Sequence, residues 1–406
     1  MISDNFMKVL EKEFYDKVIF DKEKIREASR SPYNISPHLK KFERDADVLF
    51  KPISEEDIEI LLKICEEYSV PVIPFGGRSG TLGQTIPIYG GVLVDMNSLR
   101  GEPIVDKNSI AVKPGNKVFE VLRKLRKYGK ELMVYPSSYY IATMGGYIGA
   151  GNVGIGAFQY GYFYHNALIS AKIYSPRGSR VLNNVLGIAQ AAGTTGIVTE
   201  AEFKTVDIDD WRDQILSFDE TESFLKLINY LYESREYTRR VTIEDKETFE
   251  KVTGIEGRRW NVIVSSKLKL GTEVDKVFDK IAFAAIYVYF YKNNPFKNYH
   301  YEAMLMEFND FIKVSEELKR TLGKGIMIHG DLMSIKGKRI VYAVFMSERE
   351  NFIFIMERLK ENGYYYNLHS YQINDYHEDP EVIREIIRLK REVDPKDILN
   401  RGKLRY

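Results

Sequence analysis

The chain lacks the features that would place it outside the ordinary globular class. Among its 406 residues a single cysteine, Cys65, excludes an internal disulfide framework and a cysteine-rich zinc site. Acidic and basic residues nearly balance at a net charge of +1, so no overall charge attracts nucleic acid or an acidic membrane. The longest apolar stretch, residues 281–291, is too short for a transmembrane segment. The N-terminus shows no signal-peptide pattern, and a cytoplasmic protein is the default expectation, with peripheral membrane attachment through residues 281–291 as the alternative.

The first half of the chain reads as an α/β unit. Strand and helix signals alternate over residues 47–114. Ser54 is predicted to cap a helix, with Asp57 three residues on as a variant of the capping box. Asn116 is predicted to cap a later helix, with Gly129 as its stop signal. Cys65, on the apolar side of the first helix, is expected to be a buried inert thiol.

The most informative stretch is residues 71–95, PVIPFGGRSGTLGQTIPIYGGVLVD. An apolar run leads into Gly76, Gly77, Gly80 and Gly83, and a second apolar run follows, which predicts a strand, a glycine loop and a strand. Glycine tolerates φ > 0 and has no side chain in the way, so several backbone N–H groups can approach one anion. The loop is therefore predicted to hold a pyrophosphate.

Two common phosphate-binding loops do not fit this stretch. A Walker A loop ends in Gly-Lys-Ser/Thr, and no lysine lies between Pro71 and Asp95. A Rossmann fingerprint opens a helix, whereas here Gln84, Pro87 and a strand follow the glycines. The pattern therefore argues against both a P-loop NTPase and a Rossmann NAD site.

Two further regions differ in character. Seven of the seventeen residues from Gly145 to Gly161 are glycine, interleaved with apolar and aromatic residues, which favours closely packed backbone over a flexible linker. Beyond about Val206 glycine thins out, and helices alternate with strands as in an antiparallel sheet covered by helices. The helices are predicted at 222–233, 273–289, 308–321 and 349–362, and the strands at 260–266, 324–331 and 339–346.

Ordered motifs along the chain resemble the vanillyl-alcohol oxidase / p-cresol methylhydroxylase flavoprotein superfamily, nearest its glycolate oxidase and D-lactate dehydrogenase branch. The resemblance is strong over residues 43–206 and at the tail, and weak between them. The matching residues are Pro71, Pro74, Gly76, Gly77, Ser79, Gly80, Gly83, Pro87, Gly90, Gly91, Asp95 and Met96; Val112, Pro114 and Gly115; Pro136 to Ser138; Ala142 to Gly146; Asn152, Gly154, Tyr160 and Gly161; Gly193 to Glu200; Asp394 and Pro395; and Ile398 to Asn400 with Gly402 to Leu404.

The resemblance implies an α+β protein with a two-part FAD-binding domain and a substrate (cap) domain built on an antiparallel sheet. The expected boundaries are an N-terminal helical segment at 1–42, the FAD-binding domain at 43–206, the cap domain at 207–385 and a return to the FAD-binding domain at 386–406. The cofactor-binding residues it implies are Gly76, Gly77, Arg78, Ser79, Gly80, Thr81, Pro136, Ser138, Thr143, Gly145, Gly146, Asn152, Gly154, Ile197 and Val198. Some relatives bond the flavin through a histidine in the loop; Ser79 stands at that place, so non-covalent FAD is expected.

The implied reaction is the FAD-dependent oxidation of a small alcohol, such as a 2-hydroxy acid like lactate or glycolate. The branch's metal-binding histidines and glutamate are displaced or absent: His329 is one place out of register, and Leu368 stands where the glutamate would. No metal is therefore expected. This loss keeps a phenolic or sugar alcohol open as substrate, and the chain could also be a flavin-binding subunit of a multi-subunit dehydrogenase. The electron acceptor and oligomeric state stay open.

Three residues are candidates for catalysis. His369 matches the family's base, which would take the hydroxyl proton, and imidazole suits this because its pKa lies near neutrality. A purely structural histidine in a domain interface is an equal alternative. Tyr371, two residues on, and His329 are secondary candidates. Arg239, Arg240, Arg258 and Arg259 could hold a carboxylate, although a solvated charge run explains most of them.

Overall fold

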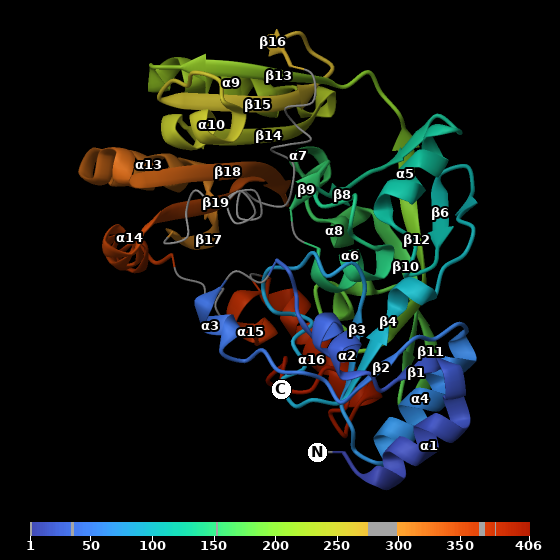
Figure 1. The fold of residues 1–406 in the computed structure, drawn as a ribbon. Helices are drawn as coiled ribbons and strands as arrows, with labels where there is room; N and C mark the ends of the chain where they lie inside the picture. Colours follow the sequence, from blue (N-terminus) through green and yellow to red (C-terminus); the bar gives the residue numbers. More distant parts are fainter. Residues whose placement is uncertain (1, 34–35, 152, 275–298, 365–369, 378) are drawn as a thin grey trace.

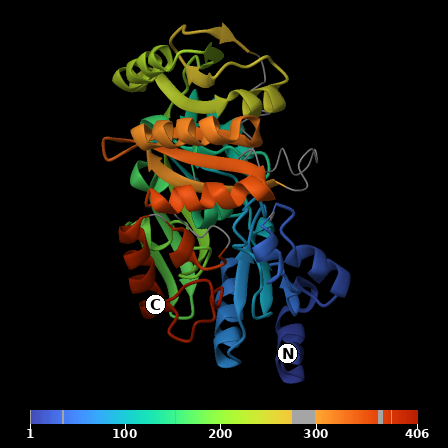
Figure 2. The ribbon, with the colours of Figure 1, turned by 90° about the vertical axis from the view of Figure 1, so that its left-hand side faces the viewer.

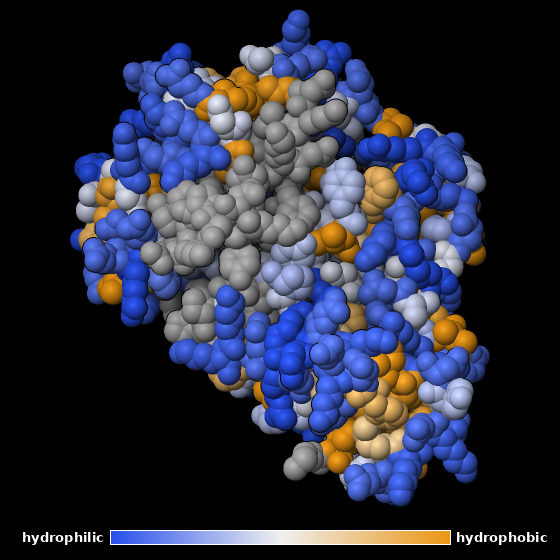
Figure 3. Space-filling model, in the orientation of Figure 1, coloured by the Kyte–Doolittle hydropathy of each residue, from blue (hydrophilic) through white to orange (hydrophobic). Residues whose placement is uncertain are grey.

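The computed structural model describes the chain except for residues 1, 34–35, 152, 275–298, 365–369 and 378. Figures 1 and 2 show an antiparallel sheet with its helices stacked over two smaller sheets, and both chain ends lie on the side away from the antiparallel sheet. No helix within the described ranges is long and apolar enough to cross a membrane. Hydrophilic side chains cover most of the face seen in Figure 3.

The first sheet contains the glycine loop. Its strand order is β1 (Val18–Ile19), β2 (Val48–Phe50), β4 (Val92–Asp95) and β3 (Val72–Phe75), with β2, β4 and β3 parallel. Around it lie α1 (Asp4–Phe14), η1 (Tyr15–Lys17), α2 (Lys22–Ser29), α3 (Pro37–Lys40), α4 (Glu55–Glu67) and η2 (Met96–Ser98). Ser54 and Asp57 form the predicted capping box of α4, and Cys65 is buried in that helix.

The second sheet has β11 (Gly178–Leu182), β10 (Leu168–Ser175), β12 (Ile197–Asp207), β6 (Ser109–Val112) and β5 (Ile104–Val105) in order, with β7 (Lys130–Leu132) also on β12. Its helices are α5 (Val118–Arg126), α6 (Met144–Ala150), α7 (Ala157–Tyr160), α8 (Phe163–Asn166) and η3 (Val185–Gly187), and β8 (Tyr135–Pro136) pairs with β9 (Gly154–Ile155). Asn116 does not cap α5 as predicted. Its side chain accepts from the N–H of Lys113 and donates to the carbonyl of Gly101, so Lys117 takes the N-cap position.

The third sheet is antiparallel throughout, as predicted. Its order is β16 (Thr272–Glu273), β13 (Arg212–Phe218), β15 (Trp260–Ser266), β14 (Thr238–Asp245), β18 (Ile326–Ile335), β19 (Lys338–Glu348) and β17 (Tyr299–Glu307). Its helices are α9 (Thr221–Glu233), η4 (Arg235–Tyr237), α10 (Lys246–Thr253), α13 (Phe308–Leu322), η5 (Gly323–Gly325) and α14 (Arg349–Glu361). The predicted helix 273–289 lies almost wholly outside the described residues.

Each central strand of this sheet buries its two faces in two different hydrophobic cores. On β19, Val341, Ala343 and Phe345 pack with residues of α9, α13 and α14, while Val344 and Met346 join the core that contains α5 and α6. Successive side chains of a strand point to opposite faces, so the sheet is the wall between its own helices and the rest of the molecule. Polar residues on the second face therefore look toward the glycine-rich part.

The C-terminal segment returns to the first sheet. After α15 (Ile373–Tyr376) and α16 (Pro380–Val393), the N–H of Val72 donates to the carbonyl of Ile398 at 2.8 Å, and the N–H of Asn400 donates to the carbonyl of Val72 at 2.8 Å. The Asn400 side chain donates to the carbonyls of Gln84 (2.9 Å) and Ala192 (2.7 Å). The tail thus joins two loops that are far apart in sequence. The exact domain boundaries stay a prediction.

Candidate functional site

A cavity of about 540 Å³ lies between the glycine-rich loops and the second face of the antiparallel sheet. One side is formed by the loop after β3, the start of α6 and the start of β12. The opposite side is formed by β17, β18 and β19, through residues such as Leu305, Asp331 and Tyr342. Since ligand sites in proteins commonly measure 300–1,000 Å³, about this size, the cavity is the default binding site.

Most of the predicted cofactor-binding residues line this cavity: Gly76, Gly77, Arg78, Ser79, Gly80, Thr81, Pro136, Ser138, Thr143, Gly145, Gly146, Ile197 and Val198. Asn152 lies outside the described residues. Gly154 borders a smaller neighbouring cavity instead. The structure therefore gathers residues from two distant glycine-rich regions around one space, while the part that each plays toward a cofactor stays a prediction.

The glycine loop lies directly on the segment before α6. A Cβ added to Gly76 would meet Thr143 Oγ1 at 2.0 Å, and one added to Gly77 would meet the carbonyl oxygen of Ile141 at 2.0 Å. Thr143 in turn caps α6 by accepting from the N–H of Gly146. Only glycine allows this approach, which is why both positions carry no side chain.

Two polar side chains hold the loop in place. Asn97 donates to the carbonyl of Gly76 at 2.9 Å, and Lys117 donates both to Asn97 Oδ1 and to the carbonyl of Ile141, each at 3.0 Å. Through Asn97, Lys117 therefore links the glycine loop to the segment before α6. Because it is half-buried there, desolvation lowers the pKa of Lys117.

Arg78 is tied down by the backbone of the N-terminal region. Its guanidinium donates to the carbonyls of Glu27 (2.6 Å) and Arg30 (3.1 Å), and its φ of 53° is unusual for a non-glycine residue. Its charge lies beside the loop, although part of its hydrogen-bonding capacity is already used. On the other side of the loop, Ser138 donates to Ser79 at 3.4 Å.

The three predicted catalytic residues are placed differently. His369 lies outside the described residues. Tyr371 packs its ring against Phe42, with ring centroids 4.8 Å apart, and Lys403 Nζ lies 5.7 Å from that ring. His329 is buried within β18. Neither Tyr371 nor His329 is among the described residues that line the cavity, so their roles in catalysis remain predictions without added support.

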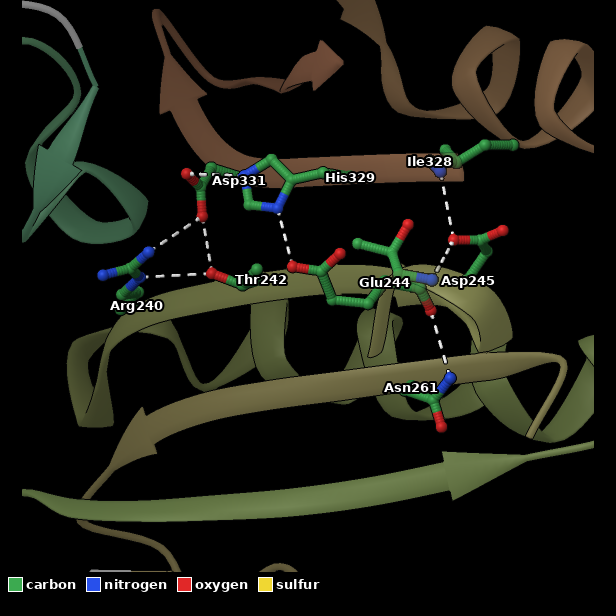
Figure 4. A network of polar contacts seen from close by, with 9 residues as sticks. Arg240, Thr242, Glu244, Asp245, Asn261, Ile328, His329 and Asp331 are labelled. Atoms are coloured by element: carbon green, nitrogen blue, oxygen red, sulfur yellow. Dashed lines mark hydrogen bonds and ion pairs between the residues drawn. The ribbon is translucent and has the colours of Figure 1, made fainter. Parts of the chain in front are cut away.

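His329 instead belongs to a buried polar network on the second face of the sheet (Figure 4). Its Nδ1 lies 2.7 Å from Glu244 Oε1 and its Nε2 lies 3.2 Å from Asp331 Oδ2. Asp331 Oδ1 also accepts from Thr242 at 2.5 Å and from Arg240 at 3.4 Å. Of these side chains, Asp331 is the one that reaches the main cavity, with 19% of its side chain exposed.

In this network the positive charges of His329 and Arg240 favour the ionised form of Asp331, and the negative charge of Asp331 favours the ionised form of His329. Burial alone would lower the pKa of His329, but the carboxylates of Glu244 and Asp331 outweigh it and raise that pKa to about 10. Burial likewise opposes ionisation of Asp331, yet Arg240 and His329 hold its pKa well below the usual range. Burial raises the pKa of Glu244 to about 7 against the pull of His329. Asp331 is therefore a carboxylate at neutral pH, beside an imidazolium.

Several cavity residues were missed by the sequence reasoning. Tyr162 and Tyr164 stack 5.0 Å apart, and His165 contacts both rings. His377 Nδ1 accepts from the N–H of Asp379, while no described residue gives its buried Nε2 a hydrogen-bond partner. Burial lowers the pKa of His377 to about 4, so its ring is neutral at pH 7. Among the described residues no cluster suited to a metal ion is found.

The cavity fits a long nucleotide cofactor. Gly76 and Gly77 line the cavity without side chains of their own, and Ser79, Thr81 and Ser138 line the same region. Such a loop is suited to an anion such as a pyrophosphate.

Comparison with known proteins identifies this cofactor as FAD. Residues 46–182 match the family described as FAD binding domain. A relative in Arabidopsis thaliana, the mitochondrial D-lactate dehydrogenase [cytochrome], is 32% identical over 168 residues, which cover 38% of this chain and 29% of that protein. The match therefore spans less than a third of the relative's length.

Solved structures share the fold over nearly the whole chain. An alkyldihydroxyacetonephosphate synthase superposes with a TM-score of 0.74 and 18% identity, covering 98% of this chain and 85% of that one. A substrate-bound p-cresol methylhydroxylase superposes with a TM-score of 0.68 and 13% identity, covering 99% and 98%. At these identities the likeness concerns the fold alone.

Gly77→Ala should weaken the binding of FAD. The new Cβ would meet a backbone oxygen at 2.0 Å, so the loop or the segment before α6 must shift. Overpacking typically costs about 1–3 kcal/mol, which corresponds to an affinity loss of roughly 5- to 150-fold if the strain is relieved at the expense of binding. FAD content and Kd can be measured by flavin absorbance. Gly101→Ala is the matched control, because its Cβ would meet only Lys113 Cγ at 3.1 Å. Equal FAD affinity in the two variants would contradict the expectation.

The buried His329–Glu244 pair should make the protein less stable at alkaline pH. Because its folded pKa is raised from 6.5 to about 10, His329 contributes stability that is complete below pH 6.5 and is lost as the pH rises through 10. The two groups titrate together, so both must be replaced. A His329→Gln, Glu244→Gln double variant should lose less stability between pH 7 and pH 10 than the wild type, measured as the shift in urea midpoint. Equal shifts of the urea midpoint in the two proteins would contradict a contribution of the His329–Glu244 pair to stability.

Proposed function

We propose that this chain, whose residues 46–182 match an FAD binding domain, is a p-cresol methylhydroxylase-type oxidoreductase that oxidises a small alcohol at its CH–OH carbon. The observation that carries the proposal is the continuity of one cavity. It runs from the glycine loop at Gly76 and Gly77 to the polar face of the antiparallel sheet at Asp331 and Tyr342. A cofactor and a small substrate can thus share one enclosed space.

The glycine loop would hold the pyrophosphate of FAD through backbone N–H groups, and Ser138 and Thr143 lie where they can contact the rest of the cofactor. When bound, FAD supplies an acceptor for the substrate hydride at its N5 position. The protein's own task is to bind the alcohol, orient its C–H bond, exclude water and receive the hydroxyl proton.

The antiparallel sheet supplies the substrate side of the cavity. Tyr342 and Tyr364 give it aromatic surface, and Leu305 and Ile340 give it apolar surface. Asp331 and His377 add polar groups with different hydrogen-bonding character: an ionised acceptor and a neutral ring. His369 is the proposed acceptor of the substrate hydroxyl proton, because it matches the base of the family motif.

Two substrate classes are candidates. A 2-hydroxy acid, such as lactate or glycolate, is supported by the similarity to a D-lactate dehydrogenase. An uncharged phenolic or sugar alcohol is supported by the cavity itself, because Glu307, Asp331 and Asp379 place carboxylates on its wall. Arg78 is the one arginine or lysine found among the described lining residues, and it lies at the glycine loop.

FAD should be held without a covalent bond, because Ser79 occupies the loop position at which some relatives carry the bonding histidine. The purified protein should be yellow, and acid precipitation should release free FAD into the supernatant. Flavin absorbance that stays with the pellet would contradict this expectation. Re-dissolving the pellet in denaturant gives the control for flavin trapped by aggregation.

Anaerobic mixing with a substrate should bleach the flavin absorbance. The panel should contain 2-hydroxy acids, phenols and sugar alcohols, and we expect one class to reduce the cofactor while the others do not. His369→Ala should slow bleaching by at least about 100-fold if His369 is the general base. Dithionite reduction serves as the control for an accessible cofactor. Bleaching by dithionite but by no alcohol would overturn the proposed reaction.

A further inference from the structure

Asp331 is a hydrogen-bond acceptor whose protein donors approach from the sheet side. Thr242, Arg240 and His329 contact its carboxylate, at 2.5, 3.4 and 3.2 Å. All three come from β14 and β18, and Figure 4 shows Arg240 and Thr242 below the Asp331 carboxylate, with His329 beside it. A carboxylate has about four lone-pair positions, so one remains for a group in the cavity.

The cations of the network are more deeply buried than the carboxylate, and Arg240 borders the smaller neighbouring cavity together with Asp331. The side chains of Arg240 and His329 are 8% and 2% exposed, against 19% for Asp331. Neither cation is among the described residues that line the main cavity. A ligand on that side therefore meets the acceptor oxygens of Asp331, held ionised by the two cations, before it meets either positive charge.

The other two wall carboxylates are engaged differently. Glu307 pairs with Lys338 at 2.8 Å on an exposed edge. Asp379 caps α16 by accepting from the N–H of Glu381 at 2.9 Å. Asp331 is thus the carboxylate on the cavity wall that is held by side chains of the sheet strands. It lies in the same cross-strand row as Leu305, Tyr342 and Thr242.

We propose that Asp331 selects for substrates that present an uncharged hydrogen-bond donor beside the reacting carbon, and against 2-hydroxy acids. This inference rests on the proposed function of the same cavity. A substrate hydroxyl can donate to Asp331. In a 2-hydroxy acid the carboxylate is attached to the carbon that bears that hydroxyl, so it would lie within a few ångströms of a second negative charge. An amide, a phenol or a polyol avoids this repulsion.

The test uses ligands that bind but cannot be oxidised. 2-Hydroxy-2-methylpropanoate and 2-hydroxy-2-phenylpropanoate lack a hydrogen on the hydroxyl-bearing carbon, and each has an uncharged amide of nearly the same shape. Their Kd values for the FAD-loaded protein can be measured by perturbation of the flavin spectrum and by calorimetry. We expect at least one amide to bind about tenfold or more tightly than its acid, the size of one charge-assisted hydrogen bond.

Asp331→Asn should abolish the preference for the amide, because it removes the negative charge and leaves Arg240 and His329 to attract the acid. Asp219→Asn is the matched control, since Asp219 is an exposed carboxylate that pairs with Arg258 at 2.7 Å, and it should keep the wild-type ratio. If Asp331→Asn does not fold, Asp331→Glu keeps the charge and should retain the preference for the amide. An acid that binds more tightly than its amide, no binding of either amide, or an unchanged ratio in Asp331→Asn would overturn the proposal.

This result is independent of turnover. A preference for the amide that Asp331→Asn abolishes would support the role of Asp331 even if no alcohol bleached the flavin. Bleaching by 2-hydroxy acids alone, together with tighter binding of the acids, would instead support the proposed reaction and remove the selectivity assigned to Asp331.

Discussion

The close contact between the glycine loop and the segment before α6 is the constraint on which the rest of the site depends. Gly77 brings its backbone against Ile141, and Gly76 lies against Thr143, so two segments more than 60 residues apart share one surface. Asn97 and Lys117 fix this contact by hydrogen bonds to both segments. The cavity exists because these two pieces of backbone meet without intervening side chains.

The opposite wall of the cavity, on the antiparallel sheet, is formed by side chains rather than by closely packed backbone. Its strands bury apolar residues on the helix-covered face, and place Arg240, Thr242, Glu244, His329 and Asp331 on the other. Buried charges are costly unless they are paired and hydrogen-bonded. Pairing within this network allows the sheet to present one ionised carboxylate to the cavity while its counter-ions stay buried. One wall therefore offers the cavity mainly backbone, and the other offers it side chains.

The sequence predicted the first wall better than the second. The glycine loop and the capping box of α4 are local patterns, and both are found in the structure. The cap at Asn116 was wrong because that side chain binds backbone groups outside the helix. Tyr342 and His377 could not be found, since their place depends on strand pairing and on the return of the C-terminal segment. The network joining Glu244 to His329 spans 85 residues, and no local pattern reports such a contact.

Residues near the C-terminal end of the sequence fasten loops that lie much earlier in it. Asn400 joins the carbonyls of Gln84 and Ala192, and Lys403, buried, donates to the carbonyl of Gly83 at 2.5 Å. During synthesis the chain emerges from its N-terminus, so the glycine loop is made long before the residues that fasten it. The hydrogen bonds that fasten the loop can therefore form only after Asn400 and Lys403 have themselves been synthesised.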